Sequence, residues 1–504
     1  MRQSEYKPLL FTTTMRNPER LKDFLSILIN YDGEILDNEL INKVAVTLIQ
    51  KGLYRPTKAS QSVKNLWKNE IDLSDQDAKY VFSKNPQSHK EAGFDNGWPS
   101  RFDTWFKIGK ELGFVWYWPN EKMQFSESGK MLLDKEKPEN EILVFANAFA
   151  KYQRNNPFRR VLNKNVPLIL LLQTIEWLNK DSEFNNAGIS RLEIPLLLCW
   201  KNDDANELYA TIKKLRKKYS YAPSNETILN LCYDLLSETK RDDKSILVDY
   251  PDEFIRKMRL TGLISLRGNG RFIDVNKKEL NAVNFILKNY TSYPVFTDEK
   301  KYFKYIGTVD KHLISAFTIY KTPIRSSNTE LQKWVNHYEW ETIKTELLNL
   351  ASKKSSSDSI LKIIEQPLRL EFLTSLAILK KLPTVIVKPN YISDDEGLPM
   401  SFASGGLPDI ECNEKSNTIL LEVTLLTGTQ QFIRESFSVH RHLEDFINKG
   451  ISTYSIFISP KSFIDTERYF RFIKNQNGLE VRIADIDKFV NRLEEKPSLN
   501  EVSL

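Results

Sequence analysis

LPDIECNEKSNTILLEVTLL, residues 407–426, places two acids in the most strand-like part of the chain. Asp409 follows a proline, and Glu422 lies 13 positions later with apolar residues on both sides. The pattern predicts strands over 407–412 and 417–426, with Glu422 in the middle of the second. A buried ionised acid is costly unless something pairs with it, and a metal ion is one of the few adequate partners. The stretch therefore predicts a functional acid on a sheet.

The surrounding sequence predicts an α/β layout with a mixed central sheet. Helices are expected at 366–381, 429–448 and 462–474, and further strands at 383–388, 453–459 and 479–484. The low-apolar stretch SKKSSSDS (352–359) has the composition of a linker and predicts the last domain boundary.

Two further acids lie on the helices beside these strands. Glu371 belongs to the nearly all-apolar helix 366–381, in which Pro367 suits the first turn. Glu435 follows Glu422 by 13 positions on the helix 429–448. The buried stripe of that helix is expected to contain Phe432, Ser436, Val439, Leu443 and Phe446, with Gln431, Glu435 and His442 on a face beside it.

Four acids on a helix, two strands and a following helix can converge at one edge of a sheet. Clustered carboxylates repel one another unless a divalent cation is present, and hard oxygen ligands favour Mg²⁺. Such an ion can activate a water and stabilise charge on a phosphodiester. Taken singly, each acid has a simpler explanation: Glu435 as a surface acid, or Glu371 as the partner of Arg369.

A second pattern occurs twice in the first half of the chain: a helix, a glycine turn and a short hairpin, at 101–128 and 252–275. This is the sequence outline of a winged helix, in which one helix can enter the major groove. Basic residues suited to phosphate contact are Arg101, Lys107 and Lys110 in the first copy and Arg256, Lys257, Arg259, Arg267 and Arg271 in the second. The alternative is a pair of structural modules with solvated lysines, and KKLRKK (213–218) is interpreted as a solvated helix face.

Composition narrows the class of protein. The length of 504 residues predicts several domains, and the net charge of +6 is compatible with nucleic acid binding. Three widely spaced cysteines argue against a disulfide framework or a zinc cluster. The first residues lack the apolar core of a signal peptide, and the run VPLILLL (166–172) is too short to span a bilayer, so we expect a cytoplasmic protein with no membrane partner.

The acidic segment resembles a known family. PD followed by E-V-T is similar to the active site of PD-(D/E)xK nucleases, and residues 407–443 resemble more closely the AlwI-type group of type IIS restriction endonucleases and their strand-nicking relatives. Glu371 precedes Asp409 by 38 positions, as the acidic helix residue of that group does. FTTTMRNPERLKDFLSIL (11–28) resembles the opening segment of the family, and 113–132 and 259–272 resemble its two DNA-recognition submodules.

The resemblance implies a multidomain α/β enzyme: N-terminal helical and winged-helix DNA-recognition modules, then a PD-(D/E)xK-like α/β nuclease domain with a mixed sheet. We expect recognition submodules at 1–135 and 136–285, a helical linker region at 286–359 and the nuclease domain at 360–504. The enzyme would bind a short asymmetric site in double-stranded DNA and hydrolyse it a few base pairs to one side with Mg²⁺. A cognate methyltransferase would protect host DNA.

The same resemblance implies roles for the acids. Asp409 and Glu422 would bind Mg²⁺, together with the backbone carbonyl of Val423 and with Glu371 directly or through water; Glu435 would position water or a second metal. The motif lysine is absent, because Thr424 stands in its place. Its function could fall to supporting groups among Thr424, Gln431, Arg434, Arg441 and His442, or to a second metal at Glu435.

Three alternatives bear on the reaction. A single nuclease site cuts one strand, so the enzyme is either a nickase or one that cuts both strands through a transient homodimer or a second nuclease subunit. A DNA-binding regulator with an inactive nuclease-like domain would show no Mg²⁺ dependence. A methyltransferase is disfavoured, since the sequence has no glycine-rich cofactor loop after an early strand and no Asn/Asp-Pro-Pro-aromatic motif.

Overall fold

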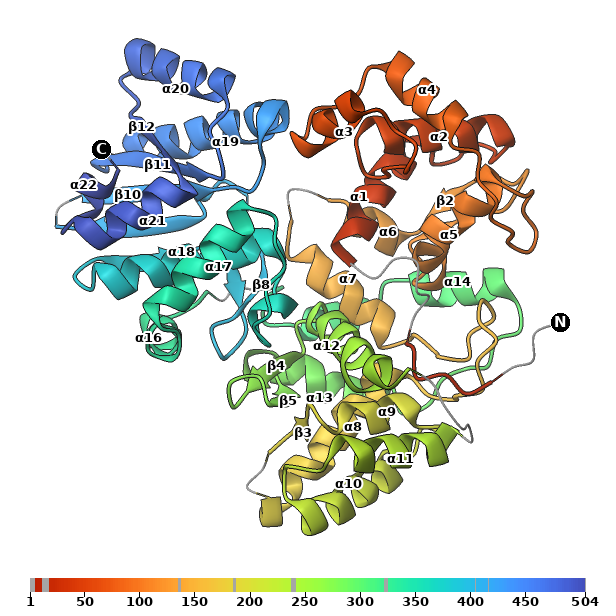
Figure 1. Cartoon of the computed structure of the whole chain (residues 1–504). Helices are drawn as coiled ribbons and strands as arrows, with labels where there is room; N and C mark the ends of the chain where they lie inside the picture. Colours follow the sequence, from red (N-terminus) through yellow and green to blue (C-terminus); the bar gives the residue numbers. More distant parts are fainter. Residues whose placement is uncertain are drawn as a thin grey trace. The chain divides into compact units, whose positions relative to one another are not determined.

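A computed structural model describes residues 5–10, 18–134, 137–184, 187–236, 242–320, 325–403, 405–415 and 417–503 (Figure 1). The chain divides into two units: unit 1 contains residues 1–45, 86–134 and 140–322, and unit 2 contains residues 46–85, 135–139 and 323–504. Residues 11–17 of the family-like opening segment, and the predicted boundary at 135/136, lie outside the described residues.

The centre of unit 2 is a five-stranded mixed sheet of order β12-β11-β10-β9-β6. β10, β11 and β12 run parallel, whereas β9 pairs antiparallel with both β10 and β6. The strands are β6 (Ile386–Pro389), β9 (Ile410–Glu414), β10 (Asn417–Val423), β11 (Thr453–Ser459) and β12 (Val481–Asp485). The mixed α/β prediction is confirmed, and the predicted strand at 417–426 ends three residues early, at Val423.

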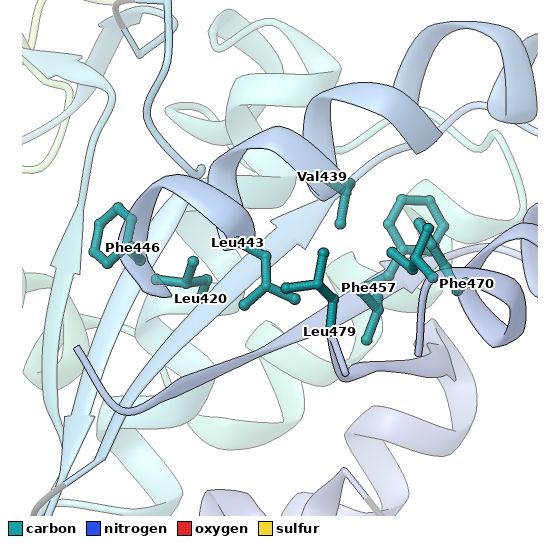
Figure 2. Packing of buried hydrophobic residues seen from close by; sticks show 9 residues of the cluster. Leu420, Val439, Leu443, Phe446, Phe457, Phe470 and Leu479 are labelled. Atoms are coloured by element: carbon teal, nitrogen blue, oxygen red, sulfur yellow. The ribbon is translucent and has the colours of Figure 1, made fainter. Parts of the chain in front are cut away.

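One face of this sheet is covered by α19 (Gly428–Asn448) and α20 (Ile464–Asn477), as Figure 2 shows. Their core consists of Val439, Leu443 and Phe446 from α19, Phe470 and Ile473 from α20, and Leu420, Phe457, Leu479 and Val481 from the sheet and the segment before β12. Because side chains alternate along a strand, Leu420 and Glu422 project to this same face. Of the stripe predicted for α19, Phe432 is only partly buried, since it lies in a half-exposed aromatic group with Phe437 and Tyr469.

Figure 1 shows α17 (Trp340–Ala351), α18 (Gln366–Lys381) and α21 (Ile486–Glu495) on the other side of the sheet. α18 has the predicted bounds and carries a proline in its first turn. The remaining elements of unit 2 are α3 (Gln61–Lys68), α4 (Asp75–Lys84), α16 (Asn328–His337), α22 (Leu499–Val502) and the small hairpin of β7 (Ile392–Ser393) and β8 (Pro399–Ser401).

Unit 1 is largely helical. Its helices are α1 (Pro18–Leu28), α5 (Trp98–Glu111), α6 (Glu127–Leu132), α7 (Asn140–Phe149), α8 (Pro167–Lys180), α9 (Ile194–Cys199), α10 (Ala205–Tyr219), α11 (Asn225–Leu236), α12 (Tyr250–Arg259), α13 (Leu280–Asn289), α14 (Glu299–Gly307) and α15 (Lys311–Ala316). Helix α2 (Asn38–Gln50) contains the division between residues 45 and 46. None of the helices in the described part of the chain combines the length and apolar character needed to cross a bilayer.

Both expected helix–hairpin modules are present in unit 1. α5 precedes the hairpin of β1 (Val115–Trp116) and β2 (Gln124–Phe125), and α12 precedes the hairpin of β4 (Ile264–Arg267) and β5 (Phe272–Val275), to which β3 (Ile189–Ser190) adds a third strand. Gly113 adopts φ +75°, and a Cβ there would lie 2.5 Å from the backbone nitrogen of Gly307, so the first module requires glycine at its turn.

The division into units differs from the boundaries expected from composition. The expected boundary at 285/286 lies within α13, and the region 286–359 is shared between the two units. The stretch 352–359 lies inside unit 2, where it joins α17 to the helical turn Leu361–Ile363 before α18. Its serine-rich composition therefore marks a connection between packed helices rather than a link between units.

Candidate active site

Asp409 lies at the start of β9, and its backbone is fixed by Asn390. The Asn390 backbone N–H donates to the Asp409 carbonyl at 2.9 Å, and the buried Asn390 side chain donates to the Pro408 carbonyl at 2.8 Å. The carboxylate of Asp409 accepts a hydrogen bond from the backbone N–H of Val423, with Oδ2 2.7 Å from the nitrogen. This bond joins the start of β9 to the end of the neighbouring strand β10.

Glu422 immediately precedes Val423 on β10, and its side chain is buried. Its Oε1 lies 2.8 Å from Nδ1 of His442, a buried residue in the second half of α19. Helix α19 packs against β10 through its apolar stripe, so His442 is held over the carboxylate by the same packing that builds the core. Glu422 and His442 are therefore in direct contact, a pairing that the sequence did not specify.

Glu435 reaches the same end of β10 from α19. The hydroxyl of Thr424 donates to Oε1 of Glu435 at 3.0 Å, and Thr424 is itself buried. The Thr424 backbone N–H donates to Ile458, which keeps this residue in line with β11. The position of the missing motif lysine is thus taken by a neutral hydroxyl that is bonded to an acid.

Glu371 approaches from α18. It is only 3 % exposed, and its Oε2 has no hydrogen-bond partner among the described residues. The guanidinium of Arg369 donates instead to the carbonyl of Leu361 at 2.9 Å. Glu371 is therefore a buried carboxylate with an unused oxygen, a costly arrangement in the absence of a compensating group.

The electrostatics show that the four acids form one cluster. Burial raises the pKa of Glu371 well above its usual value, and the charges of Asp409 and Glu422 raise it further. Burial and the charge of Glu422 raise the pKa of Asp409 well above its usual value. Burial and the charge of Glu435 raise the pKa of Glu422 in the same way. Burial also raises the pKa of Glu435, although the Thr424 hydrogen bond opposes this. Each ionised acid therefore makes ionisation of the others more difficult.

The cluster has the donor chemistry of a site for a hard divalent cation. Its donors are carboxylate oxygens, at least one of them unpartnered, and a cation would offset the mutual repulsion. In the described residues, however, no three His, Cys, Asp or Glu side chains are already gathered as ligands. Asp409 Oδ2 and Glu422 Oε1 are engaged by Val423 and His442, so metal binding would use the remaining oxygens.

Comparison with known proteins identifies the family. The sequence profile of the AlwI restriction endonuclease family matches residues 110–328 and 314–490, which together make up more than half of the chain. The chain belongs to the AlwI restriction endonuclease family. As a family member it is a type II restriction endonuclease, a nuclease that acts on DNA. The family resemblance seen in residues 407–443 is confirmed. Enzymes of this kind generally depend on divalent metal ions, which agrees with the donor chemistry of the acid cluster.

Solved structures give further similarities. The small subunit of the heterodimeric restriction endonuclease R.BspD6I is 26% identical, with 31% of this chain and 77% of that chain covered and a TM-score of 0.27. The restriction endonuclease FokI is 11% identical over 100% of this chain and 98% of its own, with a TM-score of 0.29. FokI bound to DNA is 10% identical over 98% and 96%, with a TM-score of 0.23. No curated protein matches the chain.

The supporting residues of this AlwI-family enzyme divide into two groups. Gln431 is buried, but its amide donates to the carbonyls of Leu426 and Lys461 and accepts from the N–H of Phe463. It therefore fixes the first turn of α19 to the loop after β11, and its polar atoms are used there. Arg434 and Arg441 are exposed on α19. The charge of Arg434 partly opposes the rise that burial causes in the pKa of Glu435. Burial lowers the pKa of His442, and the charge of Arg441 lowers it further.

The basic residues of the two modules differ in accessibility. Arg271 is exposed in the turn of the second hairpin, and Arg101, Lys107, Arg256 and Arg267 are partly buried. Of these, Lys107 pairs with Glu91 at 3.6 Å and Arg267 with Asp274 at 3.3 Å. Arg271 thus remains the most accessible candidate for phosphate contact.

Three other basic residues do not fit the prediction of phosphate contact. Lys110 and Lys257 are 3 % exposed and Arg259 is 6 % exposed. Lys110 pairs with Asp103 at 3.3 Å and lies over the ring of Tyr117, and Lys257 lies 3.4 Å from Glu253. All three side chains are buried in unit 1, and the charges of Lys110 and Lys257 are paired there, which a count of basic residues along the sequence could not reveal.

Proposed function

We propose that this enzyme is a type IIS restriction endonuclease that binds a short asymmetric duplex site and hydrolyses a phosphodiester to one side of it with Mg²⁺. The observation that carries the proposal is the cluster of Glu371, Asp409, Glu422 and Glu435 at the end of a parallel strand. Burial raises the pKa of each of these acids, and repulsion by neighbouring acids raises those of Glu371, Asp409 and Glu422 further. Structure alone has no use for such a cluster, because replacing the acids by apolar residues would cost less.

Asp409, Glu422 and Glu371 would hold the cation, with the carbonyl of Val423 as a further ligand. When bound, Mg²⁺ lowers the pKa of a coordinated water and offsets charge on the phosphodiester. The protein keeps its own ligands rigid: the Val423 N–H orients Asp409, and His442 orients Glu422. Glu435, held by Thr424 at 3.0 Å, would position the attacking water.

The two helix–hairpin modules of unit 1 would bind the recognition site as winged helices, with Arg271 among the phosphate contacts and base reading left to other side chains. Separate modules for recognition and cleavage suit a cut outside the site. We propose recognition submodules within 1–285 apart from the segment 46–85, which belongs to unit 2, and the nuclease domain at 360–504; residues 286–359 lie between them in the sequence and are shared by the two units. The host genome would be protected by a cognate methyltransferase.

The number of strands cut is a second question. The described residues contain one such acid cluster, and one cluster hydrolyses one strand at a time. A chain acting alone would therefore nick, and cleavage of both strands would need a second copy or another nuclease subunit. We propose double-strand cleavage through transient self-association, with nicking as the alternative outcome.

The test uses a supercoiled plasmid library, with Mg²⁺ or EDTA, and sequencing of the ends. Asp409→Ala is the active-site variant, and Asp465→Ala, which changes an exposed acid on α20, is the matched control. We expect Mg²⁺-dependent breaks at a fixed offset from one motif, lost only in Asp409→Ala. The proportion of open-circle and linear products then separates nicking from double-strand cleavage. An intact plasmid with specific gel-shift binding would refute the proposal in favour of a regulator.

A further inference from the structure

The first turn of α19 is held by a carboxylate from a distant part of the sequence. Thr427 precedes this helix, and its side chain makes no capping bond to the helix itself. Instead the Thr427 N–H and hydroxyl donate to Oε2 of Glu70 at 2.9 and 3.3 Å. Glu70 lies in the connection between α3 and α4, and both residues belong to unit 2.

The same connection makes further contacts at this point. Oε1 of Glu70 pairs with Nζ of Lys353 at 2.5 Å, so each carboxylate oxygen has a partner. Gly428, with φ +61°, allows the backbone to approach closely, since a Cβ there would lie 2.5 Å from the carbonyl oxygen of Asn69. Glu70 itself adopts φ 56°, an unfavourable value for a residue with a side chain, so the surrounding contacts hold it in place.

Helix α19 needs such a partner. Its first turn contains no acidic residue, and its N-terminal N–H groups have no side-chain acceptor from Thr427. A carboxylate near a helix N-terminus interacts favourably with the helix dipole. Glu70 accepts from the N–H and the hydroxyl of Thr427, the residue before the helix, and in this way fixes the start of α19.

This turn is close in sequence to the acid cluster. Thr427 is three positions after Thr424, whose hydroxyl is bonded to Glu435, and Glu435 lies two turns into α19. A shift of the first turn would alter the distance between the end of β10 and Glu435. The apolar core contacts of α19 begin later, at Val439, so polar contacts hold this end of the helix: those of Gln431 with the loop after β11 and those of Glu70 with Thr427.

We infer that Glu70 is a positioning residue for the cleavage reaction, acting through the first turn of α19 on Glu435. The inference rests on the proposed nuclease function and extends it, because a residue from the segment 46–85, far from the nuclease motif, sets the geometry of the site. Removing Glu70 slows the chemical step and leaves DNA affinity unchanged.

The experiment compares Glu70→Ala and Glu70→Gln with Lys353→Ala, which removes only the ion pair. We measure the single-turnover cleavage rate at saturating enzyme, DNA affinity by gel shift, and hydrogen exchange at residues 425–435. Loss of the Glu70 hydrogen bonds to Thr427 corresponds to a rate decrease of about five- to tenfold if the whole effect reaches the chemical step. We expect this decrease for Glu70→Ala with affinity constant within about twofold, faster exchange at 427–431, and a smaller effect for Glu70→Gln, whose amide oxygen still accepts. Lys353→Ala should retain most of the rate.

Several results would overturn the inference: a Glu70→Ala variant that cleaves at the original rate or faster, one whose affinity falls in parallel with its rate, or unchanged exchange at 427–431. If the unmodified protein shows no Mg²⁺-dependent cleavage, the proposed function fails. The exchange measurement still tests whether Glu70 holds the start of α19, so the two failures are distinguishable.

Discussion

Neutralising one acid of the cluster should stabilise the metal-free protein. In the native protein the Val423 N–H donates to the Asp409 carboxylate at 2.7 Å. In Asp409→Asn the amide oxygen can still accept this bond, so the connection between β9 and β10 is retained. What the substitution removes is a carboxyl group whose ionisation is opposed by burial and by the charges of Glu422 and Glu435. Under the proposed function, the native enzyme keeps this acid for metal binding at the expense of stability.

The direction follows from the shifts in pKa, and the magnitude from the usual size of a single-substitution effect at a buried site. One pKa unit corresponds to about 1.4 kcal/mol, and both Asp409 and Glu371 are raised well above their usual values. Relief of part of this repulsion at neutral pH should increase the free energy of unfolding by about 1–3 kcal/mol. For a unit of roughly 200 residues that is a rise in Tm of about 3–8 °C.

The assay measures thermal unfolding by differential scanning calorimetry, in EDTA and at increasing concentrations of Mg²⁺. A cation that binds only the folded protein contributes about 2.7 kcal/mol at 100 times its Kd. We therefore expect the order of stability to cross: Asp409→Asn has the higher Tm in EDTA, and the unmodified protein has the higher Tm at saturating Mg²⁺. A variant less stable than the unmodified protein in EDTA, or stabilised equally by Mg²⁺, would refute the reasoning.

Three further predictions concern unit 1. Gly113→Ala, with both a positive φ and backbone contact, should lower the free energy of unfolding by more than about 2 kcal/mol in urea titrations, whereas Gly33→Ala, with φ +92° and open space, should lose only about 1 kcal/mol. Burial lowers the pKa of Lys151 to about 8, so the folded state binds fewer protons than the unfolded state above that pH; stability rises through the window from about 8 to 10.5, and Lys151→Met should remove this component when denaturation is compared at pH 7 and 10. Arg271→Ala should weaken DNA binding and reduce its salt slope by about one, whereas Lys110→Ala should chiefly lower Tm because its partner acid is left buried; a selective loss of DNA affinity in Lys110→Ala would contradict this assignment.

The nuclease-like part of the chain could be predicted because its signals are local. The apolar run around Glu422 forms β10, and the stripe at Val439, Leu443 and Phe446 faces the sheet as expected. Once a strand and the helix after it are placed, alternation and helical period determine which acids share a face. Helical period placed Glu435 and His442 on one face of α19, whereas the contact between His442 and Glu422 emerged only from the structure.

Accessibility could not be predicted in the same way. Lys110, Lys257 and Arg259 occupy positions where a basic residue suits DNA, yet their side chains lie inside unit 1. A long basic side chain buries its apolar stem wherever a partner for its charge exists, and that partner is set by tertiary packing. For the same reason the serine-rich stretch 352–359 has the composition of a linker, although it connects helices of one unit.

The role of Glu70 illustrates a more general limit. Nothing near Glu70 in the sequence distinguishes it from a solvated surface acid, and its partner Thr427 is 357 positions away. The local sequence shows only that the start of α19 lacks its own stabilising side chains. The helix begins after a threonine whose side chain does not cap it, and its first turn contains no acid. A helix that begins after a residue without a side-chain cap leaves that residue available to a distant acceptor, and only the fold identifies Glu70 as the residue that bonds to Thr427.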